Sequence, residues 1–271
     1  MDGPGIEERR AMFPRGLEQP PGSYRFGADA LALAGMTAEL PLAGNAALCE
    51  LGTGCGAASL AVLLSRPGWS VAGLEKDGGL CAAAGRNARA LGLDGRFVPV
   101  QGDAGEEGVL KAVRTALGSF AGHEAGGLFD AVFCNPPWKD PRSGRMPRGS
   151  LRREALFAAP ETMGVFFSAA DRLLKARGSL VAIAGSWRTA DMLAALPVRL
   201  HPERLHFFLP GPGAGAELTV LIARKNGRAR LKVSVGTLQA LLALRPDEPA
   251  SFHGQPAEGK PVPAEEDGTP A

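Results

Sequence analysis

The sequence has few of the residues that build disulfide frameworks or metal sites. Its 271 residues include only four cysteines and four histidines. The cysteines form no CxxC pair, and neither they nor the histidines follow the spacing of metal ligands. We therefore expect reduced thiols, no metal centre and a cytoplasmic location.

Long apolar runs are also missing. No stretch approaches the roughly 20 uninterrupted apolar residues that a membrane-spanning helix needs. The first residues, MDGPGIEERRAMFPRGLEQPPG, contain no apolar segment typical of a signal peptide. Hydrophobic residues nevertheless make up 45% of the chain, which is an ordinary share for a globular protein with a core. We expect a monomer that does not associate with membranes.

Charge is nearly balanced over the whole chain but unevenly distributed. Residues 246–271 contain six acids, one lysine and six prolines, and are expected to form a disordered tail. The tail carries −5 and the whole chain +2, so residues 1–245 carry +7, which permits a polyanionic partner without requiring one. Residues 1–22 are rich in glycine, proline and charge and are expected to be an irregular arm. One folded domain then spans residues 23–245.

Short apolar runs alternate with helix-like stretches through the middle of the chain. The expected strands are 46–50, 70–75, 96–101, 129–135, 179–185, 204–209 and 218–224, and the expected helices are 28–40, 57–65, 78–91, 105–117 and 161–176. This alternation predicts a parallel, doubly wound α/β sheet. A turn rich in glycine and proline at 210–215 joins the last two strands, so an antiparallel hairpin is expected at one edge.

A glycine-rich turn follows the first expected strand. It reads Glu50-Leu-Gly-Thr-Gly-Cys-Gly56, and its glycines allow a tight turn against whose bare backbone a ligand can lie. The G-x-G-x-G spacing departs from the dinucleotide fingerprint, which makes an NAD site the weaker interpretation. Glu75 closes the second strand 19 residues past Gly56, where a carboxylate can accept both hydroxyls of a ribose.

Two further strand ends complete the expected cofactor site. Asp103 follows the third strand, at the same edge of the sheet, where it could bind an adenine amino group. Asn135 follows the fourth strand, which neighbours the first at the point where ligands bind in such sheets. The candidate cofactor residues are Glu50, Gly52, Thr53, Gly54, Gly56, Glu75, Asp103 and Asn135.

The fourth strand runs into Asn135-Pro-Pro-Trp138, and adjacent prolines cannot continue a strand. An amino group conjugated to a ring is a poor nucleophile because its lone pair is delocalised. The side-chain oxygen of Asn135 and the carbonyl of Pro136 can each accept one N–H bond, which favours the tetrahedral geometry that frees this lone pair. Trp138 offers a face on which an extruded base can stack. The candidate catalytic residues are Asn135, Pro136 and Trp138.

Together these motifs resemble the class I, Rossmann-like methyltransferases of the N-P-P-[YFW] type, over roughly residues 13–235. The chain is further similar to the tRNA (adenine-N6) methyltransferases that modify valine tRNA, in its opening run Gly22-Ser-Tyr-Arg-Phe-Gly-Ala-Asp29 and in the Arg152-Arg153-Glu154-Ala155 stretch. The resemblance implies S-adenosylmethionine as cofactor and adenine N6 in tRNA as methyl acceptor. It also implies a mostly parallel seven-stranded sheet, ordered 3-2-1-4-5-7-6, with helices on both faces.

A basic loop follows the candidate catalytic residues. Residues 139–153 contain six basic side chains and one acid, so we expect RNA phosphates to bind there, mainly at Arg142, Arg145 and Arg148. Three alternatives stay open. They are methylation of a glutamine in a release factor or other protein, methylation of guanine N2 in rRNA, and a non-catalytic RNA-binding role.

Overall fold

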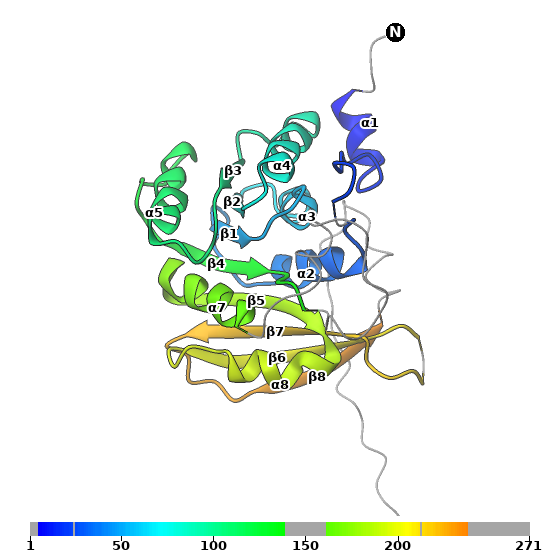
Figure 1. Cartoon of the computed structure of the whole chain (residues 1–271), viewed down its shortest axis with the longest axis vertical. Helices are drawn as coiled ribbons and strands as arrows, with labels where there is room; N and C mark the ends of the chain where they lie inside the picture. The colour runs from blue at the N-terminus through cyan, green and yellow to red at the C-terminus, as the bar shows by residue number, and fades with distance from the viewer. Residues whose placement is uncertain (1–4, 24, 139–160, 212, 238–271) are drawn as a thin grey trace, which may run out of the picture.

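The structure is a computed structural model that describes residues 5–23, 25–138, 161–211 and 213–237. These residues form one eight-stranded sheet in the order β3-β2-β1-β4-β5-β7-β6-β8, shown in Figure 1. The strands are β1 (Ala47–Leu51), β2 (Ser70–Glu75), β3 (Phe97–Gln101), β4 (Phe129–Cys134), β5 (Leu174–Gly185), β6 (Leu200–Leu209), β7 (Leu218–Lys225) and β8 (Lys232–Thr237).

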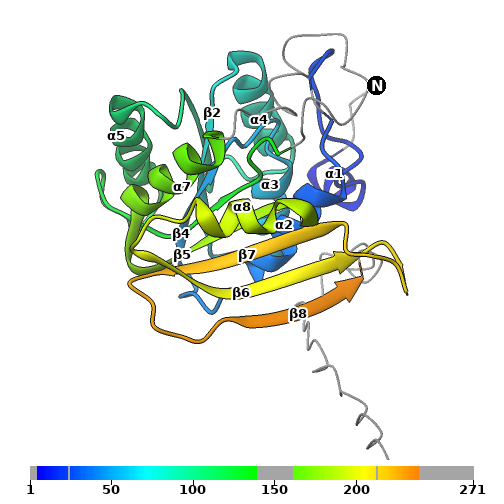
Figure 2. The same ribbon diagram turned by 60° about the horizontal axis from the view of Figure 1, so that its bottom comes forward.

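The pairing confirms a Rossmann-like, mostly parallel sheet. Strands β1 to β5 pair in parallel, whereas β7 pairs antiparallel to both β5 and β6. The expected seven-strand order is correct as far as it goes, but an eighth strand, β8, pairs in parallel with β6 and forms the outer edge (Figure 2). Its apolar side chains Val233 and Val235 alternate with polar residues but are exposed, so the strand buries little apolar surface and is defined by its pairing with β6.

Helices cover both faces of the sheet, as expected. On one face lie α2 (Ala28–Ala38), α3 (Ala57–Ser65) and α4 (Gly78–Ala90), and on the other α5 (Glu107–Ala116), α7 (Thr162–Leu173) and the short α8 (Thr189–Ala194). The residues of β1 and β2 are buried throughout, because the two helical layers enclose these central strands. The two hydrophobic cores therefore lie above and below a sheet whose strand ends remain available for a site.

Several boundaries differ from the expected ones. The expected helix 161–176 ends at Leu173, and β5 begins at Leu174, earlier than the expected start at residue 179. β5 starts before its apolar run because Leu174 pairs with Phe129 of β4. The pairing shifts register after this point, where Arg177 has a φ of 64°. The expected strand 204–209 likewise begins at Leu200.

The N-terminal arm contains one short helix, α1 (Ile6–Ala11), within the segment expected to be irregular. The arm is held against α4. The Nε of Arg10 donates to the carbonyl of Leu91 at 2.9 Å, and Glu18 forms an ion pair with Arg86 at 2.7 Å. Within the described residues no helix is both long and apolar enough to cross a membrane.

Candidate functional site

The predicted site residues follow strands that lie side by side. Leu51, at the end of β1, pairs with Cys134, at the end of β4, and with Leu74 in β2. The glycine turn and Asn135 therefore leave the sheet at the same level from neighbouring strands. This carboxyl edge is where ligands bind in open α/β sheets.

The glycine turn has the backbone shape that its composition predicts. The N–H groups of Gly52 and Thr53 both donate to the carbonyl of Leu74, at 2.8 and 2.9 Å. Gly52, Gly54 and Gly56 have φ angles of 73°, 57° and 89°, in the left-handed region that favours glycine. Nothing lies within 4 Å of the place where a Cβ of Gly54 would be. The turn thus presents open backbone to a ligand at Gly54.

Glu75 ties this turn to the end of β2. Its carboxylate accepts the N–H of Gly54 at 2.8 Å and that of Asp77 at 2.9 Å. The residue is buried, and this burial raises the pKa of its carboxyl above the usual range. A carboxylate has about four lone-pair sites, so roughly two remain for further donors. This capacity fits the two hydroxyls of a ribose.

Glu50 is buried beneath the same turn. One of its oxygens, Oε2, accepts the hydroxyl of Thr53 at 2.6 Å, the N–H of Ser59 at 3.1 Å and the hydroxyl of Ser59. Burial raises its pKa from 4.5 to about 7, although these hydrogen bonds act in the opposite direction. The hydrogen bonds of Glu50 therefore stabilise the turn from its buried side. Ser59 is a partner of Glu50 that the sequence pattern did not reveal.

Asp103 lies at the same edge but is exposed, beyond β2 at the end of β3. Its carboxylate accepts the N–H of Gly105 at 2.8 Å, which shapes the turn before α5. The structure thus places Asp103 at the predicted edge without a described contact to the glycine turn. Its role in binding an adenine amino group stays a prediction.

The amide of Asn135 is held from both sides. Its Nδ2 donates to Oδ2 of Asp29 at 2.8 Å, and its Oδ1 accepts the indole N–H of Trp138 at 3.0 Å. A carboxylate only accepts and an indole N–H only donates, so this environment selects one orientation of the amide. Asp29 is itself buried and receives the N–H of Gly27 at 3.1 Å.

Asp29 belongs to the opening run noted in the sequence, but nothing there showed that it contacts Asn135, 106 positions away. The first turn of α2 carries it to the end of β4. With one lone pair of Asn135 Oδ1 engaged by Trp138, the other remains for a donor from outside. Pro136 is buried directly after Asn135, and no described residue donates to its carbonyl. The role of the two oxygens as acceptors for an amino group stays a prediction.

Trp138 makes a contact that the sequence did not predict, since its indole N–H donates to Asn135 as described above. It also meets Trp187 edge to face, with ring centroids 5.4 Å apart. Trp187 comes from η2 (Ser186–Arg188), directly after β5, and no sequence signal beyond its strand-end position marked it. The expected phosphate contacts, Arg142, Arg145 and Arg148, lie outside the described residues.

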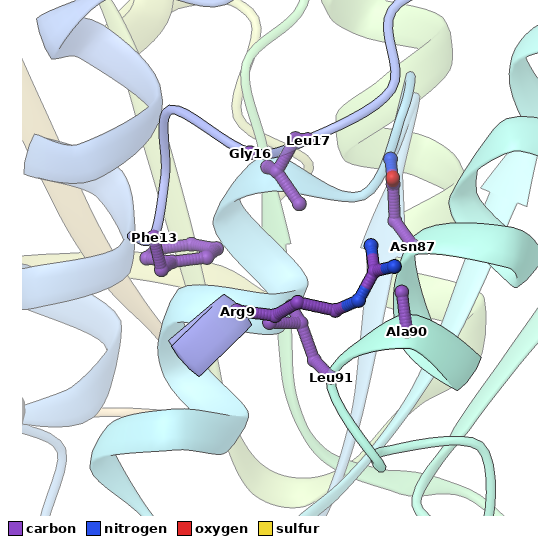
Figure 3. Close-up of a pocket in the computed structure, with 7 residues that line it drawn as sticks. All are labelled: Arg9, Phe13, Gly16, Leu17, Asn87, Ala90 and Leu91. Carbon is purple, nitrogen blue, oxygen red and sulfur yellow. The ribbon is translucent and has the colours of Figure 1, made fainter. Parts of the chain in front are cut away.

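A small pocket lies elsewhere, between the N-terminal arm and α4 (Figure 3). It is lined by Arg9, Phe13, Gly16, Leu17, Asn87, Ala90 and Leu91. It shares no residue with the predicted site. The side chain of Asn87 is already engaged, since its amide donates to the carbonyls of Glu18 and Cys55 and accepts the N–H of Glu18. The pocket is therefore separate from the predicted site, although Asn87 links its wall to Cys55 of the glycine turn.

Comparison with known proteins places the fold. No protein-family model matches the chain, and no curated protein matches it in sequence. A predicted O-methyltransferase from Agrobacterium tumefaciens superposes with a TM-score of 0.57 at 20% identity, covering 77% of this chain and 86% of that one. TrmN from Thermus thermophilus gives a TM-score of 0.47 at 21% identity, covering 72% of this chain and 48% of that one.

A TehB-like SAM-dependent methyltransferase from Corynebacterium glutamicum gives a TM-score of 0.45 at 18% identity, covering 81% of this chain and 95% of that one. Of these three structures, the Agrobacterium protein superposes with a TM-score above 0.5, and at 20% identity the likeness concerns the architecture alone. The chain therefore has the Rossmann-like fold found in these methyltransferase structures, with the predicted cofactor and catalytic residues at the carboxyl edge of its sheet.

Proposed function

We propose that the protein is an S-adenosylmethionine-dependent N-methyltransferase that methylates adenine N6 in tRNA. The observation that carries the proposal is the amide of Asn135. Asp29 and Trp138 orient it so that its oxygen keeps one free lone pair at the end of β4. This oxygen and the carbonyl of Pro136 are two acceptors, and an exocyclic amino group has two N–H donors to offer them.

The described residues fit the proposed cofactor. The backbone at Gly54 is open to a ligand. Glu75 has lone pairs that could accept the two ribose hydroxyls. Asp103, at the end of the next strand, could accept a further donor from the cofactor. Glu50, buried beneath the turn, accepts hydrogen bonds from Thr53 and Ser59 and so fixes the turn against which the cofactor would lie. When bound, S-adenosylmethionine supplies an electrophilic methyl group. The residues of the chain orient it and the acceptor.

A nitrogen acceptor suits this site better than a hydroxyl. A hydroxyl usually needs a general base that removes its proton during the transfer. Asn135 cannot act as a base, and the carboxylate of Asp29 is directed to Asn135 and Gly27. A conjugated amino group needs no base, because it becomes acidic only after the methyl group has arrived. This reasoning favours N-methylation even though the Agrobacterium protein is described as a predicted O-methyltransferase.

The acceptor is tested with purified protein and labelled S-adenosylmethionine. Separate reactions contain total tRNA, rRNA or a release factor, and nucleosides from the labelled RNA are identified by mass spectrometry. We expect N6-methyladenosine in tRNA and a steep loss of activity with added salt, because phosphate contacts release counterions. Label in the release factor alone, or as N2-methylguanosine in rRNA, would overturn the proposed acceptor. No transfer to any of the three would favour a non-catalytic role.

The cofactor is tested separately by calorimetry. Glu75→Gln should weaken binding of S-adenosylmethionine by about 1.5–3 kcal/mol, since hydrogen bonds to a charged group carry about this free energy. The matched control is Glu217→Gln, which changes an exposed carboxylate and should leave the affinity unaltered. Equal affinities of the wild type and Glu75→Gln, with the fold intact by circular dichroism, would remove Glu75 from the cofactor site.

A further inference from the structure

The surface beside Asn135 contains an aromatic side chain that the proposed function does not yet use. Trp187 is 60% exposed and is the only aromatic residue among the large, exposed hydrophobic side chains of the described chain. Exposing so much of an indole forgoes favourable burial, and such a surface commonly marks an interaction site.

The ring of Trp187 is held in place and does not simply project into solvent. It lies over Gly185, where an added Cβ would come within 2.7 Å of two ring carbons. The absence of a side chain at Gly185 therefore lets the indole lie against the end of β5. The neighbouring Ser186 donates from its backbone to the carbonyl of Glu217 at 3.0 Å, and from its hydroxyl to that of Ala216 at 2.5 Å.

The same segment is joined to the candidate catalytic motif. Arg188 donates from Nη1 to the carbonyl of Trp138 at 3.1 Å and pairs with Asp191 through Nε. The indoles of Trp138 and Trp187 contact each other at an interplanar angle of 71°, with centroids 5.4 Å apart. Because the two rings already touch, no third ring fits between them. A substrate ring that stacks on Trp187 must therefore use a part of this indole that Trp138 does not cover.

We infer that Trp187 is a substrate-binding residue that stacks a second nucleobase, next to the one that carries the methyl acceptor. The acceptor amino group must reach Asn135, so its ring belongs beside Trp138. The exposed part of Trp187 would then contact the base next to the methylated one. This inference rests on the proposed function and deepens it, because a polynucleotide supplies linked neighbouring rings and a glutamine side chain does not.

The experiment compares Trp187→Ala, Trp187→Phe and the control Val198→Ala, which truncates an exposed apolar side chain elsewhere. Binding of a short single-stranded RNA rich in adenine is measured by fluorescence anisotropy of an end label, and tRNA methylation by initial rates. Loss of one stacked base by alanine substitution corresponds to a roughly 5- to 150-fold weaker binding. We expect this loss for Trp187→Ala, a small effect for Trp187→Phe, and unchanged cofactor affinity for all three.

The two proposals fail in different ways. If the wild type does not methylate tRNA, the proposed acceptor is wrong, but RNA binding still decides the role of Trp187. Equal RNA affinity of the wild type and Trp187→Ala, or no RNA binding by the wild type, would overturn the inference. So would an equally large loss with Trp187→Phe, because a flat aromatic ring should preserve stacking.

Discussion

Buried carboxylates have different partners at the two ends of the parallel strands, which form two opposite edges of the sheet. At the carboxyl edge, Glu50 and Glu75 are buried, and neither has an ion-pair partner within the described residues. At the opposite edge, Asp171 is equally buried but lies 2.6 Å from Nη2 of Arg199 and 3.6 Å from Nζ of Lys225. Burial therefore raises the pKa of both carboxyls at the first edge, whereas the second edge carries an ion-paired cluster.

This difference is the one expected between a ligand-binding site and a structural contact. A buried charge without a partner costs free energy, and burial accordingly raises the pKa of Glu50 to about 7. A cationic ligand or hydrogen-bond donor would relieve that cost. Lys225 instead donates to the carbonyls of Asp171 and Leu174 as well as facing the carboxylate, so it joins α7 to β7 without any ligand.

The largest expected effect concerns the paired edge. Asp171→Ala should lower the free energy of unfolding by about 3–5 kcal/mol, because it leaves the buried ammonium of Lys225 without its counter-charge. Urea denaturation measures this, with Asp94→Ala as an exposed control. The affinity for S-adenosylmethionine, measured where the variant is folded, should not change. Recovery of stability in Asp171→Leu combined with Lys225→Met would identify the unpaired charge as the cause, and a loss below 1 kcal/mol for Asp171→Ala would contradict it.

A smaller effect is expected for a substitution at the carboxyl edge, where the predicted site lies. It should lower the rate of methyl transfer and leave the stability of the fold unchanged. Asn135→Ala should reduce kcat about 10²–10³-fold, since a preorganised hydrogen-bonding group at a reacting centre is worth about this factor. The measurement is the initial rate of methyl transfer to the RNA that the wild type methylates. Asn45→Ala, at an exposed position of the opposite edge, is the control. Turnover within threefold of the wild type would mean that another residue holds the acceptor.

The smallest effect is the pH dependence of stability. The carboxyl of Glu50 has a pKa of about 7 in the folded protein and 4.5 as its ordinary value, so the folded state holds the proton more tightly. Its contribution is therefore most favourable below pH 4.5 and is lost as the pH rises through about 7. Glu50→Gln should raise the unfolding midpoint at pH 8 by about 2–4 °C, corresponding to ~1 kcal/mol, and change it little at pH 5.

Thermal unfolding without ligand at both pH values measures this difference, with Glu217→Gln as the exposed control. A neutral glutamine can still accept the hydrogen bonds of Thr53 and Ser59 through its oxygen. The same shift at pH 5 and pH 8 would show that the charge of Glu50 is not the source.

Most of the fold could be predicted because its signals are local. The expected bounds of α3 and β2 match the structure, and the hairpin of β6 and β7 is antiparallel as its turn predicted. The errors occur where pairing, and not side-chain pattern, defines an element. β8 has few apolar residues, and β5 extends back to Leu174 because β4 offers it a partner. Residues 175–178 contain no large apolar side chain, and in β8 the alternation of Val233 and Val235 with polar residues is too short to stand out as a strand.

The amino-acid sequence alone determined the glycine turn, the acids that follow the strands and the break in β4 at its two prolines. Each depends on a few neighbouring residues whose backbone preferences act locally. Only the tertiary structure decided that Asp29 orients Asn135 and that Trp187 stands beside Trp138. These contacts join residues 106 and 49 positions apart, and the packing of α2 and η2 against the strand ends brings them together.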